Sequence, residues 1–212
     1  MPSYVNVTQS MQYSTDETTG FSSTKIGSGT TAIQVDGVDV INPNETAPVA
    51  VAGTLTTRTD DDTGVITITG HSFTTADTIA VFWNGGYRYD VTITAKDTNT
   101  LSFDLGSGSI LPAQTTAVTV SKKISHATAF NGTNMVAFNI GGNKSCLFSV
   151  MDDTATPVSV LAVETLANAQ YMWWTGMSTN PLTGHNITAI GIYNRDTAAA
   201  ATVFGSAGYV NA

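Results

Sequence analysis

The acidic run Asp60–Asp62, followed by Gly64, is the part of the sequence that most resembles a metal-binding loop. Hard cations such as Ca²⁺ take several oxygen ligands at alternating positions, with a glycine where the loop bends. Here the pattern stops after Gly64, without the further ligands and the bidentate Glu that complete such a loop. We therefore interpret the run as a solvated turn between two strands, TLTTR and VITIT.

Metal-binding and catalytic spacings are missing elsewhere in the sequence as well. His71, His126 and His185 lie far apart, and none belongs to an HExxH or CxxC pattern. Asp152 and Asp153 are adjacent, so on a strand they would point to opposite faces and could not flank one substrate bond. No GxSxG elbow, phosphate-cradling loop or dinucleotide fingerprint occurs. We expect no catalytic residue, no metal site and no cofactor, and therefore not an enzyme.

A cluster of large apolar residues is the strongest candidate for a binding role: Tyr171, Met172, Trp173, Trp174 and Met177. We expect alternate members to fill the core and the others to cover a subunit contact, because the cluster is too large for a thin sandwich to bury. The alternative is a platform on which flat aromatic faces stack sugar rings.

Composition favours strands and limits the possible partners. Thr and Gly are abundant, and only 11% of the 212 residues are charged. The net charge of -8 is spread along the chain without a basic segment, so we expect no nucleic-acid partner. No apolar run is long enough to span a bilayer, and the start lacks a signal peptide, which predicts synthesis in a cytoplasm and no membrane partner. The lone Cys146 is interpreted as a buried thiol.

Residues 51–123 alternate strand and turn at spacings typical of a small β-barrel or sandwich. The hairpin from Ile79 to Thr94, with its turn at Asn84-Gly85, is the clearest element within this range. We expect residues 51–123 to form a self-contained domain. Residues 124–212 contain more loosely spaced strands and predict a second, carboxy-terminal β-sandwich.

Residues 1–50 are poor in large apolar side chains and predict an extended arm. Within it, a hairpin is expected near 33–40, because Asp36-Gly37 is a two-residue turn signal between alternating apolar residues. Removal of the arm to about Asn44 should then leave a folded protein. The predicted fold class is all-β, an extended amino-terminal arm followed by two small β-sandwich or barrel domains.

The chain resembles the structural proteins of tailed bacteriophage virions. The resemblance rests on the low-charge, Thr/Gly/Ala-rich β pattern, the extended amino-terminal segment and the closing strand pair ITAIGIYNRDTAAAATVFGSAGYV. The middle segment, GHSFTTADTIAVFWNGGYRYDVTIT with LPAQTTAVTV, is similar to small β domains carried on such proteins. The resemblance covers most of the chain in general character and transfers no site residues.

This resemblance implies a structural subunit of the virion, made in the host cytoplasm. Its expected role is a capsid decoration or cement protein that stabilises the head lattice, with the major capsid protein or other virion proteins as partners. A homo-oligomer is expected, preferably a trimer, because trimers are frequent on phage heads. The alternatives are a tail or neck component and a carbohydrate-binding module for host attachment that uses Trp173 or Trp174.

Overall fold

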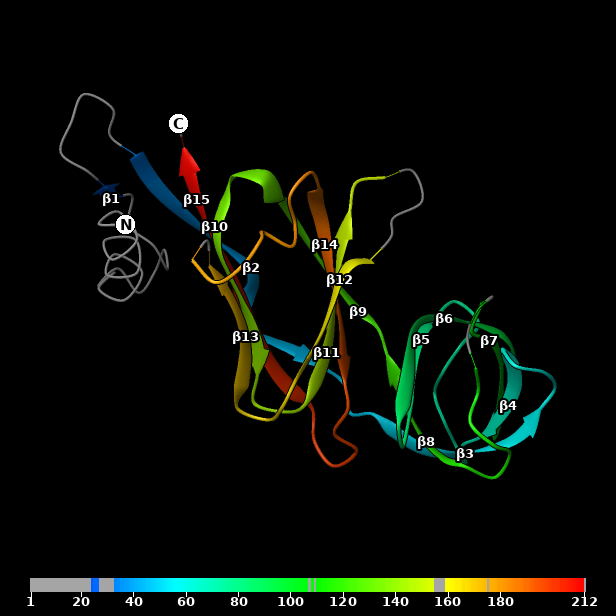
Figure 1. The fold of residues 1–212 in the computed structure, drawn as a ribbon. Coiled ribbons are helices and arrows are strands. Elements are labelled where there is room, and N and C mark those ends of the chain that lie inside the picture. The colour runs from blue at the N-terminus through cyan, green and yellow to red at the C-terminus, as the bar shows by residue number, and fades with distance from the viewer. Residues whose placement is uncertain are drawn as a thin grey trace.

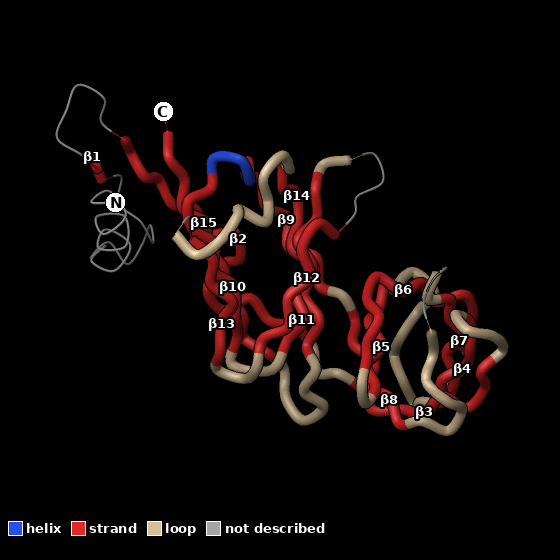
Figure 2. The backbone as a smooth tube through the Cα atoms, in the orientation of Figure 1, coloured by secondary structure: helices blue, strands red, loops and turns tan. Residues whose placement is uncertain are grey.

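The computed structural model describes residues 24–26, 33–106, 108, 110–154, 159–174 and 176–211. Strands dominate these residues, and a short 3₁₀ helix, η1 (Gly132–Asn134), is the helical element among them (Figure 2). The predicted all-β class is therefore confirmed. No helix in the described ranges has the length and apolar character needed to cross a membrane.

The strands form two units, which lie side by side in Figure 1. The barrel strands are β3 (Val51–Arg58), β4 (Thr63–Thr67), β5 (Thr78–Trp83), β6 (Gly86–Lys96), β7 (Thr100–Asp104) and β8 (Ala117–Lys122). The sandwich strands are β1 (Thr24–Ile26), β2 (Ile33–Ala47), β9 (Ile124–Asn131), β10 (Met135–Gly142), β11 (Cys146–Asp152), β12 (Ser159–Thr165), β13 (Ala169–Trp174), β14 (Asn186–Asn194) and β15 (Ala201–Asn211).

The first unit is a closed barrel with the strand order β3-β4-β7-β6-β5-β8, in which all pairs are antiparallel. Alternate residues point inward, among them Leu55, Ile66 and Phe103, and they make a core of their own. The predicted hairpin is present: β5 and β6 are joined at Asn84-Gly85, where Gly85 has a φ of 92°. The barrel spans the range that the sequence assigned to a self-contained domain.

The second unit is a sandwich of two antiparallel sheets. One sheet has five strands in the order β1-β2-β15-β10-β13, and the other has four in the order β12-β11-β14-β9. Without β1, each sheet has four strands, and consecutive strands from β9 to β15 mostly alternate between the sheets. This order is that of a jelly roll, an eight-stranded fold built from two Greek keys.

Strand β2 corrects two predictions about the amino-terminal arm. The strand is extended, but it runs without a turn through Asp36 and Gly37, which pair with Tyr209 and Gly208 of β15. The turn signal is overridden because this segment pairs continuously with β15. On the other edge, the start of β2 pairs antiparallel with β1, with Thr24 opposite Val35.

The second correction concerns burial. Val40, Ile41 and Ala47 are fully buried in the core of the sandwich, so the end of the predicted arm is a core strand. A truncation to Asn44 would remove Val40 and Ile41 from that core. The reason for expecting such a protein to stay folded no longer holds.

Because β2 precedes the barrel and β9 follows it, the barrel is an insertion between the first two strands of the jelly roll (Figure 1). The entry into the barrel is held by the sandwich. The Asn194 side-chain amide donates to the Pro48 carbonyl at 3.0 Å, and the Ala50 amide donates to the Asp196 carbonyl at 3.0 Å. The two domains suggested by the sequence are thus nested in the fold.

The inserted barrel packs against the outer face of the four-stranded sheet. Ala80 and Phe82 of β5 share a buried cluster with Leu147 of β11 and Tyr193 of β14. The Arg195 guanidinium lies over the Phe82 ring, 4.7 Å from its centroid. The outer face of the five-stranded sheet lies on the side of the sandwich away from the barrel, so the barrel does not cover it.

Candidate functional site

Strand β13 carries most of the predicted contact residues and alternates them between the two faces of its sheet. Trp173 is buried with 3% exposure, and Tyr171 packs on the same core, with its ring centroid 6.4 Å from that of Phe138. Met172 and Trp174 point the other way and are 43% and 38% exposed. The predicted division into inward and outward residues is confirmed, whereas the contact role stays a prediction.

Met177 follows β13 in a turn in which its amide donates to the Trp174 carbonyl at 2.9 Å. Its side chain is 54% exposed. The same turn satisfies the buried indole of Trp173, whose Nε1 donates to the Ser178 hydroxyl at 3.2 Å. Trp173 therefore presents no ring face to solvent and cannot be the sugar platform considered from the sequence.

The register of the sheet adds a third large apolar residue, Phe204 of β15, to the exposed side chains on this face. Gly141 of β10 pairs with Gln170 of β13 on one edge of its strand and with Phe204 of β15 on the other. Phe204 is 37% exposed. We call this surface the open face, defined by outward-pointing residues of β10, β13 and β15: Ala137, Asn139, Gly141, Gln170, Met172, Trp174, Thr202, Phe204, Ser206 and Gly208.

None of the side chains that define the open face is charged. Its apolar groups are separated by small residues, such as Ala137 beside Trp174. One polar atom on the face, Oδ1 of Asn139, is covered and has no hydrogen-bond partner among the described residues. A face with large apolar groups, no charge and an unsatisfied acceptor is better suited to contact than to solvation.

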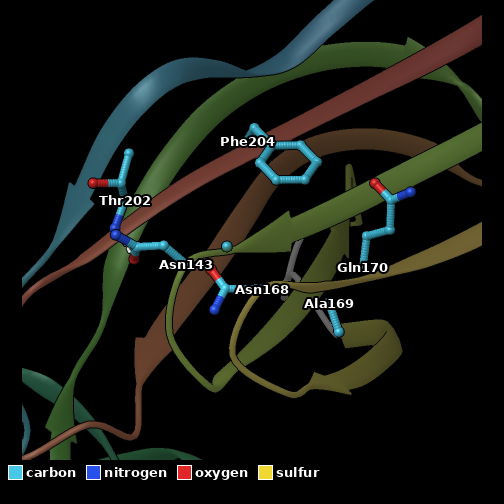
Figure 3. A pocket seen from close by; sticks show the side chains of 7 residues that line it. Asn143, Asn168, Ala169, Gln170, Thr202 and Phe204 are labelled. Atoms are coloured by element: carbon cyan, nitrogen blue, oxygen red, sulfur yellow. Dashed lines mark hydrogen bonds between the residues drawn. The ribbon is translucent and has the colours of Figure 1, made fainter.

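A hollow of about 450 Å³ lies at the loop end of the open face (Figure 3). Its lining comes from the end of β10 and the loop after it, from the turn before β13 and the start of β13, and from the start of β15. The lining residues are Gly142, Asn143, Asn168, Ala169, Gln170, Thr202 and Phe204.

The opposite face of the sandwich contains a polar cluster where it meets the barrel. Asp90 of β6 accepts hydrogen bonds at 2.6 Å from the Tyr193 hydroxyl and from Lys123 Nζ. The Asp90 amide in turn donates to the Tyr193 oxygen at 3.1 Å. Burial and the neighbouring Asp90 carboxylate raise the pKa of Tyr193 above its ordinary value.

Asp90 reaches this position through a β-bulge. The pairing of β5 with β6 shifts between Ile79 and Val81, so that Ala80 lies opposite both Tyr89 and Asp90. Asp90 has a φ of 57°, in the left-handed region that Asp tolerates better than most residues. The bulge turns the carboxylate toward the sandwich, where it joins the two units.

The other polar candidates from the sequence have local partners. Asp60 Oδ1 accepts hydrogen bonds from the backbone amides of Asp62 and Thr63 and from the Thr63 hydroxyl, which lowers its pKa to about 2. This geometry is that of a turn, in agreement with the interpretation of residues 60–64. Asp152 is buried and Asp153 exposed, so the pair is split as expected.

Each histidine lies in a different environment. His71 Nε2 is 3.2 Å from the Thr100 carbonyl, His126 is 3.4 Å from Glu45, and His185 is 3.2 Å from Asp152. Among the described residues, no group of three or more His, Cys, Asp or Glu side chains could hold a metal ion.

Cys146 is fully buried, and burial raises the pKa of its thiol to about 12. The thiol therefore stays protonated at neutral pH and packs as a small apolar group. The interpretation of Cys146 as a buried core residue is confirmed.

Comparisons of the chain with protein-family models, with curated proteins and with solved structures find no match.

Sequence reasoning missed Phe204 and the hollow beside it. The alternation in TVFGSAGYV predicts that Phe204 and Val203 point to opposite faces of the sheet, but it does not predict which face another element covers. The side chains of Asn143 and Asn168 come from two loops that only the sheet register brings together. Their one sequence signal was the Asn/Gly content of these loops, which is equally typical of ordinary turns.

Proposed function

We propose that the protein is a non-enzymatic structural subunit of a tailed-phage virion. Its preferred role is that of a capsid decoration protein that assembles through its open face. The observation that carries the proposal is the difference between the two outer faces of the sandwich. The barrel packs on part of one face, where it buries Leu147 and Tyr193, whereas on the other face Met172, Trp174 and Phe204 are exposed and no residue that defines the open face is charged.

The composition of the open face supports a protein contact. Trp, Phe and Met are enriched in the centres of protein interfaces, while charged residues are depleted there. Large apolar groups gathered on one surface usually mark such a contact. Strand β13 also lies at the end of its sheet, so its outer edge can receive a strand from another chain.

The jelly-roll order supports the choice of a virion among assemblies by analogy, since this fold is common in viral capsid proteins. A closed homo-oligomer would cover part of the open face without open-ended growth. The preferred trimer comes from the resemblance to phage head proteins. The remaining surface of the trimer would bind the major capsid protein.

The proposal is tested by placing a charge on the open face. Trp174→Glu should convert the oligomer to a monomer in sedimentation equilibrium, and it should abolish cosedimentation with undecorated capsids. Ile110→Glu is the matched control, because Ile110 is 72% exposed on a barrel loop and lies outside the face. Circular dichroism should show that both variants keep the β fold.

A wild-type protein that is monomeric at micromolar concentration would exclude the homo-oligomer. A dimer would keep the contact face but reject the trimer. The copy number in purified particles decides the position in the virion, since a decoration protein should scale with the number of capsid subunits and a tail or neck component should be present in few copies.

A further inference from the structure

The hollow at the loop end of the open face is built by the register of three strands. Gly141 of β10 lies between Phe204 of β15 and Gln170 of β13. Gly142, the next residue of β10, lines the hollow, and the Phe204 and Gln170 side chains form two of its walls. Glycine is required at 141, since a Cβ there would lie 2.7 Å from the Ala169 carbonyl oxygen.

The walls differ in chemistry. Phe204 provides an aromatic ring that is 37% exposed, and Figure 3 shows this ring and the Gln170 amide on the same hollow. Such a ring can pack against the C–H face of another ring. Gln170 donates one amide hydrogen toward the Met172 sulfur, at 2.9 Å, and its amide oxygen has no partner within the described residues.

Two asparagines supply further hydrogen-bonding groups at the rim. Asn143 Oδ1 accepts from the Thr202 amide at 2.9 Å, which holds the side chain in place and leaves its NH₂ group available. The Asn168 side chain makes no hydrogen bond to any described residue. Its backbone is fixed in a turn with a φ of 58°, where its amide donates to the Gly142 carbonyl at 3.0 Å.

The lining contains no ionisable side chain. A phosphate, carboxylate or amine ligand would therefore meet no opposite charge there. A sugar ring fits the groups that are present, because it combines an apolar C–H face with several hydroxyls that donate and accept hydrogen bonds. An amide side chain can donate a hydrogen bond to a hydroxyl through its NH₂ group and accept one through its oxygen.

We propose that this hollow binds one neutral pyranose ring, which stacks on Phe204 and is hydrogen-bonded by Asn143, Asn168 and Gln170. The site differs from the tryptophan platform considered from the sequence, since Trp173 is buried and Trp174 does not line the hollow. The proposal does not rest on the virion role. A sugar could be bound by an assembled or a free subunit.

Saturation-transfer NMR on the full chain tests the proposal, with four probes at millimolar concentration. These are methyl glucopyranoside, methyl galactopyranoside, N-acetylglucosamine and, as the charged comparison, N-acetylneuraminic acid. At least one neutral sugar should receive saturation on its ring protons. Phe204→Ala should weaken its binding by about tenfold, because the stacking surface is lost.

Asn168→Gly removes the free amide while suiting the positive φ, so it should also weaken binding without unfolding the protein. Ile110→Ala is the matched control and should bind like the wild type, because Ile110 lies on a barrel loop outside the open face. Each measurement is repeated on Trp174→Glu, so that an oligomer contact cannot hide the hollow. No transfer to any neutral sugar in both backgrounds would overturn the proposal, as would unchanged binding by Phe204→Ala or tighter binding of N-acetylneuraminic acid.

Discussion

The two outer faces of the jelly roll differ in what covers them, although both carry large aromatic or apolar side chains. On the four-stranded sheet, Leu147 and Tyr193 are fully buried because the inserted barrel packs on them. On the five-stranded sheet, Met172, Trp174 and Phe204 stay exposed within the chain. Residues of similar type thus belong to a core on one face and to a surface on the other.

The barrel therefore acts in the fold as an internal partner of the sandwich. Its contact with the sandwich has the composition of a protein interface, with an apolar centre and charged groups at the side. Asp90, Lys123 and Tyr193 form the polar part, and Phe82 lies in the apolar part. We propose that another chain makes a similar contact with the open face.

The largest expected effect is the difference in the free energy of unfolding that is lost when one aromatic residue is truncated on each face. Tyr193→Ala should destabilise the protein by about 3–5 kcal/mol, because it leaves a cavity between barrel and sandwich. Trp174→Ala should cost less than about 1 kcal/mol in the monomer, because part of its ring is already in water. Urea unfolding monitored by fluorescence and circular dichroism gives both values. Equal losses would mean that the two faces do not differ in coverage.

A smaller effect is expected from Tyr193→Phe, which keeps the ring and removes only the hydroxyl. The Asp90 amide and carboxylate then lose their shared partner, and the cost should be about 1–2 kcal/mol. Tyr171→Phe is the control. Tyr171 packs against the core side of the five-stranded sheet, and its hydroxyl makes no hydrogen bond to any described residue. A Tyr193→Phe protein as stable as the wild type would show that the polar joint adds nothing to the apolar contact.

The smallest effect concerns alkaline pH. The pKa of Tyr193 is raised in the folded protein, so the folded state holds this proton more tightly than the unfolded state does. Its contribution to stability is therefore complete below the unfolded pKa of about 10 and is lost as pH rises above that value. The stability difference between wild type and Tyr193→Phe should shrink above about pH 10. A constant difference across this range, measured by urea unfolding, would contradict the shift.

Local patterns predicted the barrel well. Three of its strand pairs, β3-β4, β5-β6 and β6-β7, join consecutive strands through short turns, which signals such as Asn84-Gly85 predict. The amino-terminal segment was harder, because Asp36-Gly37 also looks like a turn. The long-range pairing with β15, at the other end of the chain, decided that it is a strand.

The candidate site was predicted in the same partial way. The period of two in the run from Tyr171 to Trp174 predicted that neighbours point to opposite faces, and burial of Trp173 agrees. Periodicity does not state which outer face another element covers. Phe204 and the asparagine loops were therefore missed.

The sequence by itself determined the β class, the extent of the barrel and the alternation along β13, because turn chemistry and side-chain alternation act over a few residues. Only the tertiary structure decided that β2 joins β15, that the barrel is inserted into a jelly roll, and that Tyr193 is covered while Trp174 is not. These outcomes depend on contacts between segments far apart in the chain. Such contacts are selected by the total burial of apolar surface, which no local pattern records.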